Sequence, residues 1–119
     1  MPNIKIYVNE SVLTVLKPEL IAALEPLREM IIGHLDVPKS ACQVAIVSIL
    51  GLQDEPALNV EMHIMPGQKR TRKSLEALGA AIQGMLNEAT GSKIAFRCAQ
   101  LDPETYVILR VPHKPNLMS

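Results

Sequence analysis

A run of cations lies where the sequence predicts the start of a helix. Lys69, Arg70, Arg72 and Lys73 follow Gly67 and directly precede an amphipathic stretch. Cations at a helix N-terminus oppose the helix dipole by about 0.3–1 kcal/mol each, so their clustering indicates that an anion binds nearby. A solvated, charged turn is the alternative, and for Arg72 and Lys73 it is the preferred interpretation.

Arg97 is a second candidate for anion binding, because it interrupts the apolar segment Ile94–Ala99. An unpaired charge is costly to bury in a strand, so Arg97 needs an anionic partner. The alternative is an edge-strand arginine that points to solvent.

Other reactive side chains form no recognisable site. The histidines lack metal-ligand spacing, the serines have no identifiable base and orienting acid, and no glycine-rich phosphate loop is present. We therefore expect no metal and no nucleotide cofactor. Cys42 and Cys98 lie in apolar runs, where a thiol usually behaves as a small buried hydrophobe.

The composition fits one compact domain spanning residues 1–119. The chain has 12 Lys+Arg against 12 Asp+Glu and only 3% aromatic residues, which argues against a nucleic-acid partner. It has no apolar run of the roughly 20 residues that span a bilayer, and its start lacks the layout of a secretion signal, so we expect a cytoplasmic protein without a membrane partner. The mean hydropathy of +0.17 favours an oligomer that covers apolar surface.

The chain repeats itself. Leu24-Glu25, Leu27, Ile31, Gly33 and Leu35 recur 51 positions later as Leu75-Glu76, Leu78, Ile82, Gly84 and Leu86. This spacing predicts one apolar stripe on each of two helices. The repeat units extend over about 1–50 and 58–111.

Alternating segments predict strands around each helix. Ile4–Val8 and Val60–Ile64 precede the helices, and Gln43–Ile49 and Lys93–Ala99 follow them. Two β-α-β units predict an α+β, two-layer fold, with a four-stranded mixed sheet and both helices on one face. The other face is expected to be apolar, with Val44, Ile46, Leu50 and Met62 left for a subunit interface.

Further residues predict where the helices and strands begin and end. Asn9–Val15 is expected to be a connecting loop, Pro18 fits the first helical turn, and Pro26 predicts a helix break near Glu25. Gly91 is expected to end the second helix. Tyr106–Val111 predicts a short C-terminal strand that adds to a neighbour's sheet.

The pattern resembles the tautomerase superfamily. The resemblance lies in the opening Met1-Pro2, in Leu35-Asp36-Val37-Pro38 before Val44–Val47, and in Ile64-Met65-Pro66-Gly67 before a charged helix. Phe96–Pro103 is most similar to the C-terminal segment of 5-carboxymethyl-2-hydroxymuconate delta-isomerases, the double-length relatives of 4-oxalocrotonate tautomerases. The resemblance implies a homotrimer, an architecture shared with the macrophage migration inhibitory factor branch.

The resemblance also implies a reaction. Members use an amino-terminal proline, exposed by loss of the initiator methionine, as a general base. Pro2 would have this role, because an apolar pocket and nearby cations hold an amine uncharged. If Met1 stayed in place, Pro2 would be an amide and could not act as a base.

The implied substrate site combines several elements. Lys69 aligns with an arginine of the isomerases, Arg97 with a polar residue contributed by a neighbouring subunit, and Lys39 lies near a pocket lysine. Ile64 completes the implied substrate-binding set together with Gln43, which stands where 4-oxalocrotonate tautomerases carry an arginine.

The sequence leaves three functions open. The first is a cofactor-independent tautomerase or isomerase acting on a small anionic enol or unsaturated keto acid. The second is a non-catalytic trimeric binding protein that retains Met1, and the third is a decarboxylase or dehalogenase variant.

Overall fold

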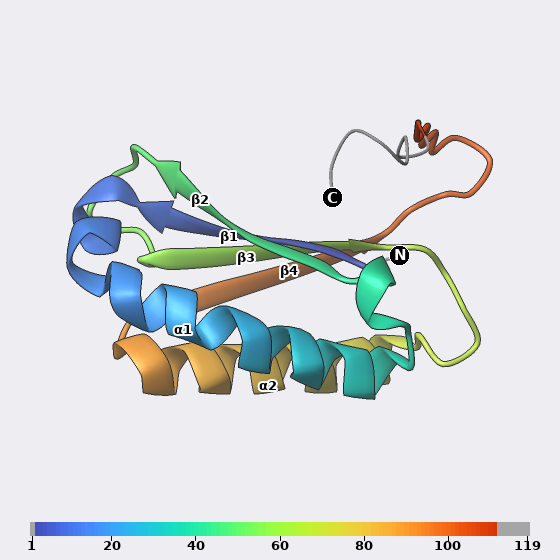
Figure 1. Cartoon of the computed structure of the whole chain (residues 1–119), viewed down its shortest axis with the longest axis horizontal. Coiled ribbons are helices and arrows are strands. Elements are labelled where there is room, and N and C mark those ends of the chain that lie inside the picture. Colours follow the sequence, from blue (N-terminus) through green and yellow to red (C-terminus); the bar gives the residue numbers. More distant parts are fainter. Residues whose placement is uncertain (1, 112–119) are drawn as a thin grey trace, which may run out of the picture.

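The computed structural model describes residues 2–111 and consists of a four-stranded sheet with two helices packed on one face (Figure 1). In chain order the elements are β1 (Asn3–Asn9), α1 (Glu10–Leu35), the 3-10 helix η1 (Lys39–Ala41), β2 (Gln43–Ile49), β3 (Leu58–Ile64), α2 (Arg72–Thr90) and β4 (Ile94–Gln100). The predicted two-layer α+β fold is confirmed.

The sheet has the order β2-β1-β3-β4. β1 pairs with β2 in parallel and β3 with β4 in parallel, so each β-α-β unit supplies one parallel pair. The two units meet through the antiparallel pairing of β1 with β3, in which Ile4 lies opposite Met62. The mixed sheet is therefore a direct consequence of the repeat.

The core lies between the sheet and the helices, because alternate residues of the inner strands point to the same side. Ile4, Ile6 and Val8 of β1 are at most 1% exposed. They meet the apolar stripes of both helices, which include the repeated pairs Leu27 and Leu78, and Ile31 and Ile82.

The opposite face of the sheet is more polar than the sequence predicted. Met62 is 0% exposed, and Val44 and Ile46 pack against the core, so these three residues belong to the helix-covered face. The register places Lys5, Glu61 and Arg97 in one row on the other face. The prediction of an apolar open face was wrong because alternation separates two faces without showing which one the helices cover.

Helix α1 is longer than predicted and is not broken. It begins at Glu10, where Oδ1 of the N-cap Asn9 accepts a hydrogen bond from the Ser11 amide over 3.3 Å, and it continues through Pro18 and Pro26 (Figure 1). The expected loop and the expected break near Glu25 are both wrong. Both prolines are exposed, so water can solvate the carbonyl groups that lose an N–H partner.

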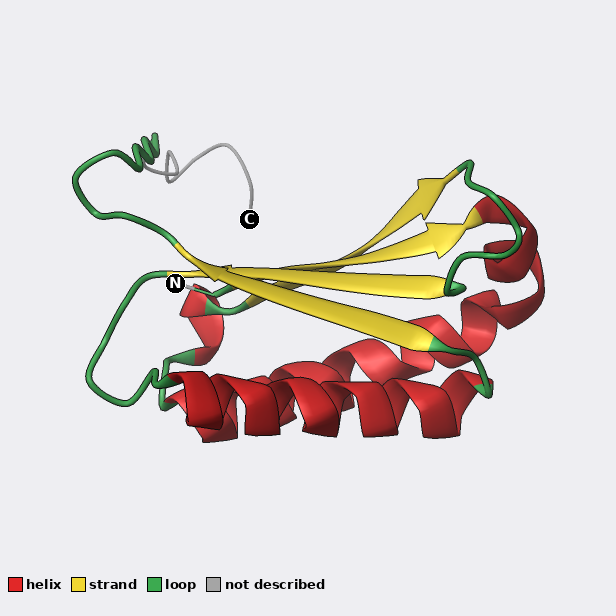
Figure 2. Ribbon diagram, turned by 180° about the vertical axis from the view of Figure 1, so that it is seen from behind, coloured by secondary structure: helices red, strands yellow, loops and turns green. Residues whose placement is uncertain are grey.

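The segment after β4 leaves the sheet (Figure 2). Gly91, with φ 67°, ends α2 as expected. Tyr106–Val111 forms no strand within the chain, and its addition to a neighbour's sheet stays a prediction. Four of its residues, Val107, Ile108, Leu109 and Val111, are 54–92% exposed. Within residues 2–111, no helix has both the length and the apolar character needed to cross a membrane.

Candidate functional site

Pro2 lies at the end of the sheet where β1 and β2 begin. It is buried, and its carbonyl oxygen accepts a hydrogen bond from the Gln43 amide over 3.1 Å. Because Asn3 pairs with His63, the register continues from Pro2 to Ile64, the last residue of β3. The structure therefore brings Pro2, Gln43 and Ile64 together.

Asn3 adds an unsatisfied polar atom at this end of the sheet. Its Oδ1 is buried and has no hydrogen-bond partner among the residues that the structure describes. A buried acceptor without a donor is costly, so this end of the sheet has hydrogen-bonding capacity that residues 2–111 do not use.

A hollow of about 400 Å³ lies between α1, η1 and the start of β2. Its lining includes Glu25, Arg28, Lys39, Ser40, Cys42 and Gln43. Two of the predicted site residues, Lys39 and Gln43, thus share one cavity. Gln43 also connects this cavity to Pro2, because its backbone amide holds the Pro2 carbonyl.

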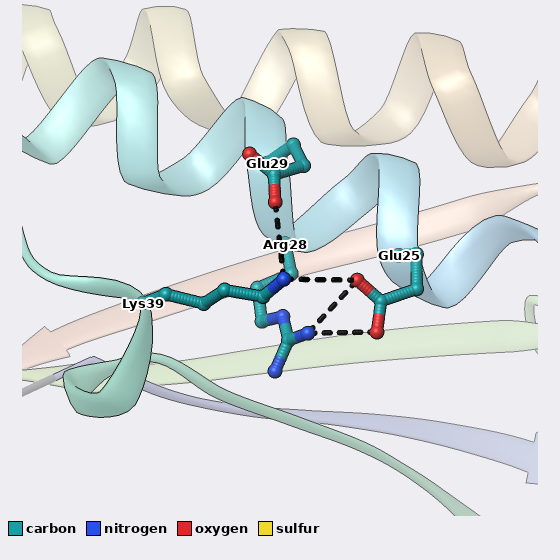
Figure 3. Close-up of polar contacts among 4 residues, drawn as sticks. All are labelled: Glu25, Arg28, Glu29 and Lys39. Atoms are coloured by element: carbon teal, nitrogen blue, oxygen red, sulfur yellow. Dashed lines mark hydrogen bonds and ion pairs between the residues drawn. The ribbon is translucent and has the colours of Figure 1, made fainter.

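Charged side chains from two elements meet in this hollow (Figure 3). Nη2 of Arg28 donates to both carboxylate oxygens of Glu25, over 2.7 and 2.8 Å. Nζ of Lys39 lies 3.9 Å from Glu25 Oε2 and 3.7 Å from Glu29 Oε1. The hydrogen bond from Arg28, aided by the charges of Arg28 and Lys39, lowers the pKa of Glu25 below its ordinary value.

Glu25 and Arg28 are not among the site residues predicted from the sequence. Their spacing of three residues along a helix is typical of a surface ion pair, which usually carries no functional information. What distinguishes Arg28 from an ordinary surface residue is its burial in the structure, because 27% of its side chain is exposed against 68% of the Glu25 side chain. Only the position of η1 beside α1 brings Arg28 into a cavity.

Cys42 is 4% exposed and contributes to the lining of the hollow. Burial raises the pKa of its thiol above the ordinary value, and the positive charge of Arg28 opposes this effect. Burial likewise raises the pKa of Cys98, which is half-buried on β4. Cys42 therefore matches the expectation of a buried thiol, and Cys98 does so in part.

The cations around the start of α2 do not converge on one point. Lys69 is 79% exposed and its Nζ lies 3.6 Å from Oδ2 of Asp36, at the end of α1. Arg70 donates to the Met65 carbonyl, and Arg72 pairs with Glu76 over 2.8 Å. Thr71 caps the helix by accepting a hydrogen bond from the Ser74 amide.

Arg97 lies away from Pro2, on the uncovered face of the sheet. Its Nη1 donates to Oδ1 of Asn59 over 3.3 Å, and its backbone pairs with Glu61. With Tyr7 these residues line a separate hollow of about 430 Å³. Within one chain the structure therefore does not join Arg97 to the other predicted site residues.

No family model and no curated protein matches the sequence. Solved structures do match the fold. Pt0534 inactivated by 2-oxo-3-pentynoate has a TM-score of 0.70 at 19% identity, with 89% of this chain and 90% of that chain covered. A fused 4-OT described as an asymmetric trimer has a TM-score of 0.66 at 13% identity, with 89% and 91% covered.

A third similar structure is FG41 malonate semialdehyde decarboxylase inhibited by 3-bromopropiolate, with a TM-score of 0.63 at 15% identity and 91% and 89% of the two chains covered. These structural neighbours are tautomerase-superfamily proteins. At such identities the likeness concerns the fold, and the chain has the fold of that superfamily.

Proposed function

We propose that this protein is a cofactor-independent tautomerase or double-bond isomerase that acts on a small anionic enol or unsaturated keto acid. Pro2 is the general base. Its amine removes a proton at one position of the substrate and returns it at another, so the reaction needs no oxidant, reductant or co-reactant. Burial of Pro2 supports this role, because desolvation favours the uncharged, basic form of an amine.

The position of Pro2 is the observation that carries the proposal. Its carbonyl is fixed by the Gln43 amide, and Gln43 lines a hollow that also contains Arg28 and Lys39. A hollow with two cations, lined by the residue whose amide fixes Pro2, suits a substrate that carries a carboxylate and develops negative charge on an enolate oxygen. The proposal requires that Met1 be removed, since only a free amine can accept the proton.

The test combines mass spectrometry with an assay. Intact mass shows whether Met1 is absent, and ketonisation of phenylenolpyruvate and of 2-hydroxymuconate is followed for the wild type, Pro2→Ala and Pro56→Ala. Pro56 is an exposed proline and provides the matched control. We expect Pro2→Ala to lower kcat/KM by about 10²- to 10⁴-fold, the usual contribution of a general base, and Pro56→Ala to change nothing.

Covalent labelling identifies the reactive group. One neighbour is inactivated by 2-oxo-3-pentynoate, so this acetylenic keto acid is a suitable probe. We expect it to add to the N-terminal proline of the processed chain and not to Pro2→Ala. A retained Met1 without turnover or labelling would rule out the proline-base reaction.

A non-catalytic binding protein of the same fold is the second candidate. The observation that favours it is that Lys39 and Lys69 already have acidic neighbours, at 3.7 and 3.6 Å. Retention of Met1, together with saturable ligand binding and no turnover, would favour this function.

We further propose that the chain self-associates as a homotrimer. One structural neighbour is described as an asymmetric trimer. In this chain, the exposed segment Tyr106–Val111 is apolar except for Arg110, and β2 is an edge strand without a charged residue. Such a segment and such an edge are complementary, because an extended chain can pair with an open strand.

A further inference from the structure

We propose that Arg28 binds the carboxylate of the ligand in the hollow between α1 and β2. Without ligand, Arg28 is ion-paired with Glu25, and the ligand carboxylate displaces Glu25 from the guanidinium. This inference rests on the proposed function, because it names the specificity-determining residue of the same site. The ligand class is a small carboxylic acid anion of a size that fits the cavity of about 400 Å³.

Burial distinguishes Arg28 from the other charged side chains of this cluster. Its side chain is 27% exposed, whereas those of Glu25, Glu29 and Lys39 are 60–68% exposed. The arginine is therefore held at the hollow, and the carboxylate of Glu25, its ion-pair partner, can rotate into solvent at little cost. A carboxylate from solution can take the place of Glu25 because it makes the same chemical contact.

The ion pair between Arg28 and Glu25 does not have the hydrogen-bond geometry that a guanidinium prefers with a carboxylate. Both hydrogen bonds to Glu25 start from the same nitrogen, Nη2. A guanidinium binds a carboxylate most specifically when two nitrogens face its two oxygens. Glu25 lies three residues before Arg28 on the same helix. A free carboxylate has no such tether and can align with the guanidinium plane.

Gln43 is common to the hollow that contains Arg28 and to the backbone contact with Pro2. Gln43 contributes to the lining, and its amide holds the carbonyl of Pro2 over 3.1 Å. Arg28 on α1 thus supplies a cation to the hollow that Gln43 also lines. Lys39, from η1, adds a second positive charge to the lining.

Adipate is the probe for the test, because it is an unreactive dicarboxylate with the same number of carbons as 2-hydroxymuconate. Binding is measured by calorimetry at pH 7 for the wild type, Arg28→Gln, Glu25→Gln and Lys17→Gln. Lys17 is an exposed cation of α1 outside the hollow and controls for the loss of one charge. Adipamide, which is neutral, controls for the carboxylate.

We expect Arg28→Gln to weaken adipate binding about tenfold or more, which matches the loss of a hydrogen bond to a charged group. Glu25→Gln should tighten binding several-fold, an outcome that partial unfolding cannot produce. Lys17→Gln should bind as the wild type does, and adipamide should not bind. Absence of saturable adipate binding, or equal weakening in Arg28→Gln and Lys17→Gln, would overturn the inference.

This test separates the two proposals. Adipate binding does not depend on the Pro2 amine, so Arg28-dependent binding without turnover refutes the proposed function and supports the carboxylate site. Conversely, turnover that requires Pro2 but has the same KM in Arg28→Gln supports the function and refutes the role of Arg28.

Discussion

Gly79 on α2 faces the ring of Phe96 on β4 so closely that a side chain at position 79 has no room. A Cβ atom on Gly79 would lie 2.5 Å from Cδ2 and 2.6 Å from Cε2 of Phe96. Gly79 is buried, and Phe96 packs against the core. The missing side chain therefore sets how closely α2 approaches the edge strand of the sheet.

Gly79→Ala should destabilise the fold. Overpacking usually lowers the free energy of unfolding by about 1–3 kcal/mol. The better helix propensity of alanine offsets about 1 kcal/mol of this loss. Phe96 must shift to admit the new methyl group, so we expect a net loss of up to about 2 kcal/mol in the free energy of unfolding, measured with urea. Gly84→Ala, on the same helix with no atom within 4 Å, is the control and should stabilise. Equal shifts in both variants would contradict the close contact.

Pro26→Ala should stabilise α1. Proline is about 3 kcal/mol less favourable than alanine inside a helix, and its restriction of the unfolded chain offsets about 0.4–1 kcal/mol of this. We expect a gain of about 1–3 kcal/mol in urea unfolding. Pro56→Ala, outside the helices, should show no gain. A destabilised Pro26→Ala would indicate that α1 is interrupted in solution.

The reaction of Cys42 with iodoacetamide should depend on pH in a defined direction. Burial raises the pKa of this thiol, so less thiolate exists at a given pH and the midpoint of the rate profile lies above that of the urea-unfolded chain. Arg28→Gln removes the opposing positive charge and should shift the midpoint further upward.

Cys98 is the internal control for this experiment. Burial also raises its pKa, but Arg28 does not contribute there, so its profile should be the same in both proteins. Peptide-resolved mass spectrometry separates the two thiols. A downward shift at Cys42, or a parallel shift at Cys98, would be incompatible with the geometry of the hollow.

Ile108→Lys should weaken self-association. Ile108 is 54% exposed in the single chain, and a charge there opposes burial against another copy. Sedimentation velocity should give three times the chain mass of 13.1 kDa for the wild type and a smaller mass for the variant. Gln53→Lys, in an exposed turn, is the control. A wild type that sediments as a monomer would refute the trimer.

The sheet could be predicted from the sequence because the apolar residues of each strand and helix repeat on the face that is buried. The repeat from Leu27 to Leu78 required two similar helices, and both are buried against one core. The same reasoning failed for α1, because a proline ends a helix only when its missing hydrogen bond cannot be replaced. Pro18 and Pro26 are exposed, and their exposure could not be predicted from the neighbouring residues in the sequence.

The candidate site was harder to predict. Pro2, Gln43 and Ile64 lie together because strand register joins them, and Lys39 reaches the same region through η1. Arg28 could not be identified, since a glutamate three residues earlier makes it look like part of a solvated helix face. Its role depends on tertiary packing against β2, about which spacing along the helix contains no information.

The edge position of β2 also bears on the tendency of the chain to form fibrils. Its seven residues, Gln43–Ile49, contain no charge and no proline, and four are β-branched. Short apolar segments of this composition stack into cross-β fibrils when their backbone groups are free. A neighbouring copy that covers β2 would therefore protect the chain from fibril growth, and dissociation would expose the strand as a template. Solubility at high concentration would then depend on the same contacts as the proposed trimer.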